Sequence, residues 1–185
     1  ISCVNEIYRA QTIDNICTWR KNNPLLLNND DVDKYISENS LYILQPEQLK
    51  IWKIIQAIPI LNFEIDGINN PLELGLADLI DFKKGCFLGQ EMMARIKNVS
   101  SLKQEVRVWK SENFFNNLNT RNEKIYLDNE KEKIVGQITR FSQLNNKEFI
   151  GLAMVKKNYL DEKNNLFSHQ FGQLKINRSI GSIFS

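Results

Sequence analysis

The sequence predicts an α+β chain, with helices and a partial sheet in residues 1–102 and a small antiparallel β-barrel-like domain in residues 103–185. The period of the apolar residues predicts this division. Before Lys103 they recur every three or four positions, the period of a helix surface, and after it every second position, the period of a strand. The later apolar runs are separated by turns rich in Asn, Asp and Lys, which is typical of short strands in a barrel or sandwich.

Several helices are predicted before the barrel. Apolar residues lie near helical spacing in Ile7–Trp19, whereas Asn28–Asp30 predicts a turn and Leu41–Leu44 a strand. Further helices are predicted from Pro71 to Ile80 and after Gly89.

The clearest helix signal starts at Pro46, a residue suited to a first helical turn. Leu49, Trp52 and Ile55 then recur at three-residue spacing, which predicts one apolar face packed on the core. Pro59 is expected to end this helix.

Five strands are predicted in the C-terminal half, within Val106–Val108, Lys124–Leu127, Ile134–Ile138, Phe149–Val155 and Leu174–Ile176.

Composition and charge exclude several functions. The 185 residues are 42% hydrophobic and 25% charged, an ordinary globular composition, and the net charge is only +2. Surfaces that bind the phosphate backbone of nucleic acids need clustered positive charge, so we expect no direct nucleic-acid binding. No apolar run reaches the about 18 residues that span a membrane. We expect a monomer in the cytoplasm, or in an organellar matrix, and a chain that begins inside a longer polypeptide, because Ile1 is not an initiator Met.

The cysteines and the histidine limit the chemistry. Cys3, Cys17 and Cys86 are an odd number without short pairing intervals, which indicates a reducing compartment and no disulfide framework. His169 is the single histidine, so no histidine-based zinc cluster forms within this chain and no metal site is expected.

One segment, Lys83–Arg95, carries the pattern of a reactive site. Cys86 follows Gly85 and precedes Gly89, so the backbone can bend sharply and leave the sulfur accessible. A helix start and two lysines beside it stabilise a thiolate over a thiol. The competing interpretation is a buried cysteine that acts as a small hydrophobe, the commoner role of a free thiol.

The octapeptide Lys84–Glu91, Lys-Gly-Cys-Phe-Leu-Gly-Gln-Glu, resembles the K-G-C-Y-x-G-Q-E signature of the YgfZ family, the folate-binding relatives of the glycine-cleavage T-protein. Only Phe87 departs from it, keeping the ring and losing the hydroxyl.

Upstream, Pro71–Leu76 resembles the family's P-x-E-x-G/N-L stretch. Arg95 resembles the arginine after the signature, and Ile134–Thr139 and Gly151–Val155 resemble paired strands of the family's C-terminal barrel. Together these matches cover about Trp52 to Val155.

The resemblance implies a fold and a role. Residues 1–102 correspond to part of a T-protein-like folate-binding domain whose N-terminal section is missing, and residues 103–185 to the C-terminal barrel. The family binds tetrahydrofolate and supports assembly or repair of iron–sulfur enzymes, including those that thiolate tRNA. Its partners are those client enzymes or assembly proteins. The resemblance makes Cys86 the residue that acts chemically.

Other site residues follow from the same resemblance. The motif residues expected to support Cys86 are Lys84, Gly85, Phe87, Gly89, Gln90, Glu91 and Arg95. Trp52 and Glu73 are candidate folate contacts, with a core position for Trp52 and a first-turn position for Glu73 as the competing interpretations. Ile55 stands where the family's pterin-binding glutamate is expected, and isoleucine accepts no hydrogen bond. We therefore expect weak folate binding.

Two other functions stay open. One is a folate-dependent aminomethyltransferase of the glycine-cleavage type, in which case the chain is an enzyme rather than an accessory factor. T-proteins, however, usually lack a cysteine at the position of Cys86 and need an aspartate from the absent N-terminal section. The other is a non-catalytic, degenerate binding module, which Ile55 favours and the intact octapeptide disfavours.

Overall fold

The computed structural model describes residues 11–13, 16–18, 29–82, 85–86, 88–91, 93–94, 102–115, 123–127, 130–161 and 164–176. The chain divides into two compact units, Ile1–Gln45 with Phe184, and Pro46–Ile183 with Ser185. The predicted boundary between residues 102 and 103 lies inside the second unit, directly before the first strand of a β-barrel.

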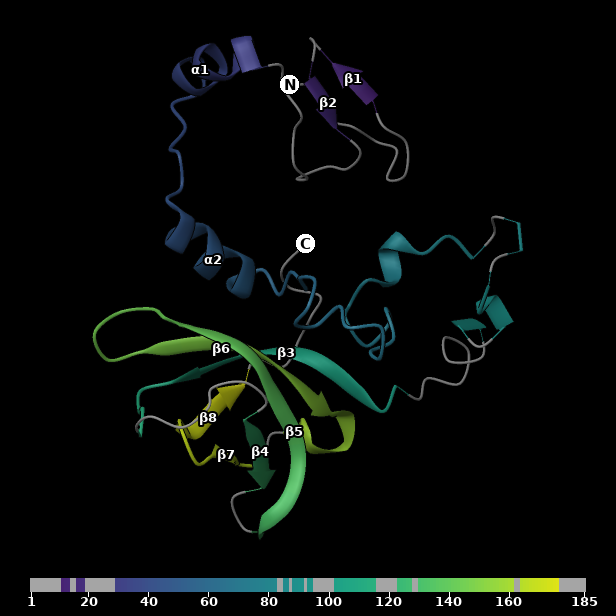
Figure 1. Cartoon of the computed structure of the whole chain (residues 1–185), viewed down its shortest axis with the longest axis vertical. Helices are drawn as coiled ribbons and strands as arrows, with labels where there is room; N and C mark the ends of the chain where they lie inside the picture. The colour runs from purple at the N-terminus through teal and green to yellow at the C-terminus, as the bar shows by residue number, and fades with distance from the viewer. Residues whose placement is uncertain are drawn as a thin grey trace. The chain divides into compact units, whose positions relative to one another are not determined.

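The second unit contains a closed antiparallel barrel, drawn in teal, green and yellow in Figure 1. Its strand order is β3-β6-β5-β4-β7-β8, which confirms the α+β class and the predicted barrel. The strands are β3 (Gln104–Ser111), β4 (Lys124–Leu127), β5 (Glu130–Gln143), β6 (Phe149–Lys156), β7 (Leu166–Ser168) and β8 (Gly172–Ile176). A 3₁₀ turn, η2 (Lys157–Tyr159), follows β6. Five of the six strands contain the predicted segments, and β7 is additional.

An aromatic and aliphatic core fills the barrel. Trp109 and Phe171 are fully buried with ring centroids 4.6 Å apart. The Trp109 indole N–H donates to the carbonyl of Leu152 at 3.2 Å, so its one polar atom is satisfied. Gly151 makes room for this ring, because a Cβ there would lie 2.6 Å from the Trp109 side chain.

A second apolar cluster covers the outer face of β3 and β6, which explains why both strands are buried on both faces. Its buried members are Ile54, Leu74, Val106, Val108, Ile150, Leu152 and Met154. Each such side chain contributes about 1.5–3 kcal/mol when it leaves water.

The helix α2 (Pro46–Ile55) supplies Ile54 to this outer cluster and lies against β6 and β5 (Figure 1). The predicted start at Pro46 is confirmed, but the helix ends before Pro59. Ala57 adopts φ +47°, and the N–H of Ile58 donates to the carbonyl of Lys53 at 2.9 Å, a closure that ends helices.

The predicted inner face of α2 is wrong. Leu49, Trp52 and Ile55 are 38%, 43% and 42% exposed, whereas Ile54 is fully buried. The helix carries apolar residues on two adjacent stripes. The stripe that contains Ile54, rather than the neighbouring stripe with Ile55, packs on β6 and forms the core face.

A helix from Pro71 to Ile80 is not formed. Asn70 and Glu73 cap a single turn, in which Asn70 Oδ1 accepts from the N–H of Leu72 at 2.9 Å and Glu73 Oε2 from the N–H of Asn70 at 3.3 Å. Gly75 at φ +73° ends the turn, and the N–H of Leu76 donates to the carbonyl of Pro71 at 3.0 Å. A short 3₁₀ helix, η1 (Ala77–Leu79), follows.

The described residues of the first unit form two short strands and one helix. β1 (Gln11–Ile13) and β2 (Ile16–Thr18) pair antiparallel, so the helix expected across Ile7–Trp19 is wrong within the described residues. The helix α1 (Asn29–Glu38) starts where a turn was predicted, because Asn and Asp favour helix N-termini as well as turns. Leu41–Leu44 is exposed and forms no strand.

No helix in the described part of the chain is long and apolar enough to cross a membrane.

Candidate functional site

Cys86 is an exposed free thiol. It precedes a turn of helix in which Gln90, Glu91, Met93 and Ala94 are helical and the N–H of Met93 donates to the carbonyl of Gly89 at 3.0 Å. Gly89 lies at φ +83°, a conformation that L side chains rarely adopt, so the glycine at this motif position is required by the backbone. The predicted accessibility of Cys86 and the predicted helix start after Gly89 are therefore observed.

The supporting motif residues are described in part. Gly85 and Gly89 are exposed with open space around them, Gln90 is half-buried and Glu91 is exposed. Lys84, Phe87 and Arg95 lie outside the described residues, as does Cys3. Cys86 is thus accessible to a reactant, the first requirement for thiol chemistry.

The two candidate folate residues lie in different settings. Trp52 is 43% exposed on α2, so the core position expected for it is wrong. Ile55 is the last residue of the same helix and is also exposed. A ligand that reached this end of α2 would meet an apolar side chain in place of a carboxylate.

Glu73 is a structural anchor of the capped turn. Its Oε2 accepts from Gln104 Nε2 at 3.3 Å as well as from the N–H of Asn70, and its carbonyl accepts from the N–H of Val106 at 2.8 Å. Glu73 thus lies in a capped turn that does not continue as a helix, so the predicted first helical turn is not formed. The turn that resembles the family's proline-glutamate stretch is bonded directly to the start of β3.

A buried ion pair, missed by the sequence analysis, fixes the loop before that turn. Glu64 is fully buried, and its Oε1 accepts from Arg140 Nε at 3.1 Å and from the Thr139 hydroxyl. Its Oε2 accepts from the N–H of Ile60 at 3.1 Å, and Arg140 also donates to the carbonyl of Ile58. The acid Glu64 within the largely apolar segment Ile60–Ile65 indicated that a buried carboxylate would need a partner. The sequence could not identify that partner, because Arg140 is 76 positions away, in a strand.

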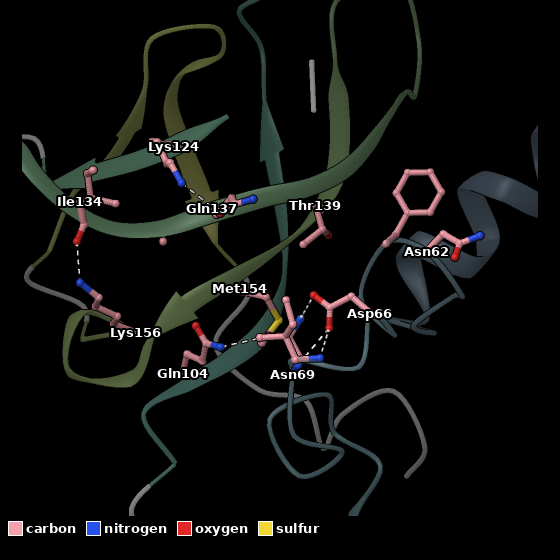
Figure 2. A pocket seen from close by; sticks show the side chains of 13 residues that line it. Asn62, Asp66, Asn69, Gln104, Lys124, Ile134, Gln137, Thr139, Met154 and Lys156 are labelled. Atoms are coloured by element: carbon pink, nitrogen blue, oxygen red, sulfur yellow. Dashed lines mark hydrogen bonds between the residues drawn. The ribbon is translucent and has the colours of Figure 1, made fainter. Parts of the chain in front are cut away.

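The same loop encloses a cleft of about 560 Å³ against the outer face of the barrel (Figure 2). The loop contributes Asn62, Phe63, Asp66, Ile68 and Asn69, and the barrel contributes residues of β3, β4, β5 and β6. At the loop end, Asp66 accepts from the N–H groups of Ile68 and Asn69, both at 2.9 Å. The pKa of the Asp66 carboxyl is lowered below its ordinary value, chiefly by the hydrogen bond from the Asn69 N–H. Partial desolvation acts in the opposite direction. Trp52, Glu73 and Cys86 do not line this cleft.

No family model matches the chain, and no curated protein matches it with significance.

Proposed function

We propose that this chain is a YgfZ-like factor that supports assembly or repair of iron–sulfur enzymes through the thiol of Cys86. The observation that carries the proposal is an exposed Cys86 in the Lys84–Glu91 octapeptide, with Gly89 in the left-handed conformation at the start of a helical turn. A thiol that served packing alone would be buried, since free cysteines are among the most buried residues.

The fold supports the same proposal. Ile134–Thr139 and Gly151–Val155, which resemble paired strands of the family's barrel, belong to β5 and β6, and these strands are neighbours with Gly136 opposite Val155. The capped turn at Pro71–Gly75, which resembles a second family stretch, is bonded to β3 of the same barrel. Residues 1–102 are, in this proposal, the partial T-protein-like domain.

Tetrahydrofolate is a weak ligand in this proposal, because Ile55 offers the pterin no acceptor. The same residue favours a second candidate function, a non-catalytic binding module that keeps the scaffold and has lost ligand chemistry. The two candidates differ in one respect that can be measured, which is whether the thiol of Cys86 is needed.

Complementation separates them. Cells that lack their own factor of this family receive the native chain or the Cys86→Ser variant, and the activity of iron–sulfur enzymes and the thiolation of tRNA are measured. Serine keeps the size and polarity of cysteine but forms no stable anion near neutral pH. We expect the native chain to restore both activities and Cys86→Ser to restore neither, at equal protein levels.

Cys17→Ser, in β2, is the matched control because it removes one thiol without touching the octapeptide. It is expected to rescue like the native chain. Full rescue by Cys86→Ser would reject thiol chemistry and favour the binding module, and failure of the native chain would reject the family role itself.

A further inference from the structure

Two lysines border one end of the 560 Å³ cleft described above. Figure 2 shows Lys124, Ile134 and Lys156 at this end, and Asn62 and Asp66 at the other. Lys124 comes from β4 and Lys156 from β6, the two neighbours of β5. The antiparallel register therefore places two lysines that are far apart in the sequence in the lining of one cleft.

Each ammonium group is tethered to β5. Lys124 Nζ donates to Gln137 Oε1 at 3.1 Å, and Lys156 Nζ donates to the carbonyl of Ile134 at 2.8 Å. A lysine ammonium has three donors, so each keeps donors for another acceptor. Because these side chains are already held in place, they lose less conformational entropy when a ligand binds.

The described part of the chain supplies no ion-pair partner for these two lysines. Among the residues that the structure describes, no carboxylate lies within ion-pair distance of Lys124 or Lys156. Asp66 is the one acid among the described residues that line the cleft. It is at the opposite end, where its oxygens accept from the N–H groups of Ile68 and Asn69 and from the Asn69 side chain.

The cleft is held open by the loop's anchors. Glu64 is bonded to Thr139 and Arg140 of β5, while the Asn69 amide oxygen accepts from Gln104 Nε2 of β3 at 3.1 Å. A site that is formed before its ligand arrives, with a volume between about 300 and 1,000 Å³, is typical of small-molecule binding.

The apolar part of the lining suits an organic body rather than a bare ion. Ile134 is 44% exposed, and Phe63 and Met154 contribute further apolar atoms. We propose that this cleft binds a small organic anion, with its carboxylate or phosphate group against Lys124 and Lys156 and its body toward Phe63 and Met154. The proposal is independent of the chemistry of Cys86.

Titration of the ¹⁵N-labelled full chain, followed by NMR at constant ionic strength, tests the proposal. The probes are benzoate and phenyl phosphate, which carry the two kinds of anionic group on one flat body, and benzamide, a neutral analogue of benzoate. We expect saturable shifts at Lys124, Gln137 and Lys156 with at least one anion, and binding of benzamide about tenfold weaker or more. The tighter anion identifies whether the natural ligand is a carboxylate or a phosphate.

The variants Lys124→Gln and Lys156→Gln are expected to weaken binding of that anion about tenfold each, with an unchanged unfolding midpoint. Lys110→Gln is the matched control, because Lys110 is exposed on β3 and does not line the cleft. Absence of saturable shifts with both anions up to about 10 mM would overturn the proposal. Equal weakening by Lys110→Gln, or equal binding of benzamide, would also overturn it, since either shows that the paired lysines do not select the ligand.

Discussion

Glu64 and Arg140 form a buried ion pair that joins the loop after α2 to the barrel strand β5. The Glu64 side chain has no exposed surface, that of Arg140 is 5% exposed, and Glu64 Oε1 lies 3.1 Å from Arg140 Nε. The Thr139 hydroxyl and the N–H of Ile60 donate to the remaining lone pairs of the carboxylate. A buried pair is stable only when its charges are compensated in this way.

We predict that Arg140→Met lowers the free energy of unfolding by about 3–5 kcal/mol, because it leaves the Glu64 carboxylate buried without its counter-charge. Urea denaturation followed by circular dichroism measures this value. The double variant Glu64→Leu with Arg140→Met is expected to recover most of the loss, since it removes both charges.

The exposed pair Lys175–Glu112 is the control. Lys175→Met should change the free energy of unfolding by less than about 1 kcal/mol, because water already solvates both groups. A loss at Arg140→Met as small as that at Lys175→Met would show that the buried pair contributes no more than a surface pair.

The barrel was predictable from the sequence because most of its strands contain apolar residues in alternation or in a continuous run. Val106–Val108 and Phe149–Val155 were found in this way and lie in β3 and β6. β7 (Leu166–Ser168) was missed, since it takes its conformation from pairing with β8 and β4. Its formation depends on contacts that no local pattern contains.

The segments before the barrel were harder to predict, because the backbone conformation of single residues decided them. Gly75 at φ +73° stops the helix expected from Pro71, and Ala57 at φ +47° ends α2 before Pro59. Of the candidate site, the exposure of Cys86 was predictable from its flanking glycines. The cleft was not, since only the register of three strands places Lys124 and Lys156 in one lining.

We predict that Gly151→Ala destabilises the barrel by about 1–3 kcal/mol, the usual effect of overpacking a core. Gly151 pairs with Trp109 across β3 and β6, and an added Cβ would lie 2.6 Å from the Trp109 ring and also clash with the carbonyl of Arg140. Thermal or urea unfolding, followed by tryptophan fluorescence, measures the loss.

Gly85→Ala is the matched control because nothing lies within 4 Å of an added Cβ there. It should leave the unfolding midpoint within error of the native value. A neutral Gly151→Ala would mean that Trp109 can move aside without loss of packing.

Asp66 should titrate below the value of about 3.9 that is usual for aspartate. The Asn69 N–H stabilises its charged form more than partial desolvation disfavours it, so the pKa is lowered on folding. A lowered pKa stabilises the folded state above the unfolded-state value, and this contribution is lost as the pH falls through the folded-state value. The ¹³C shift of the Asp66 carboxyl, recorded between about pH 2 and 6, measures the midpoint.

The amide shifts of Ile68 and Asn69 report on the same equilibrium, because both N–H groups donate to Asp66 Oδ1. In Asp66→Asn their response over this pH range should disappear. A carboxyl midpoint at or above about 3.9 would contradict the geometry of this turn.

Tetrahydrofolate should bind this chain weakly, and Ile55→Glu should strengthen the binding. In the alignment proposed above, Ile55 replaces the carboxylate that accepts hydrogen bonds from the pterin, and unpaired donors cost about 1–3 kcal/mol, or roughly ten- to a hundredfold in affinity. Ile55 is 42% exposed at the end of α2, so the fold should tolerate a glutamate there.

Isothermal titration calorimetry with tetrahydrofolate compares the native chain and the variant. Leu61→Glu, at a position that is 70% exposed and does not line the cleft, is the control for adding one negative charge and should change nothing. Tight binding by the native chain, or an equal gain from Leu61→Glu, would show that Ile55 does not occupy the pterin position.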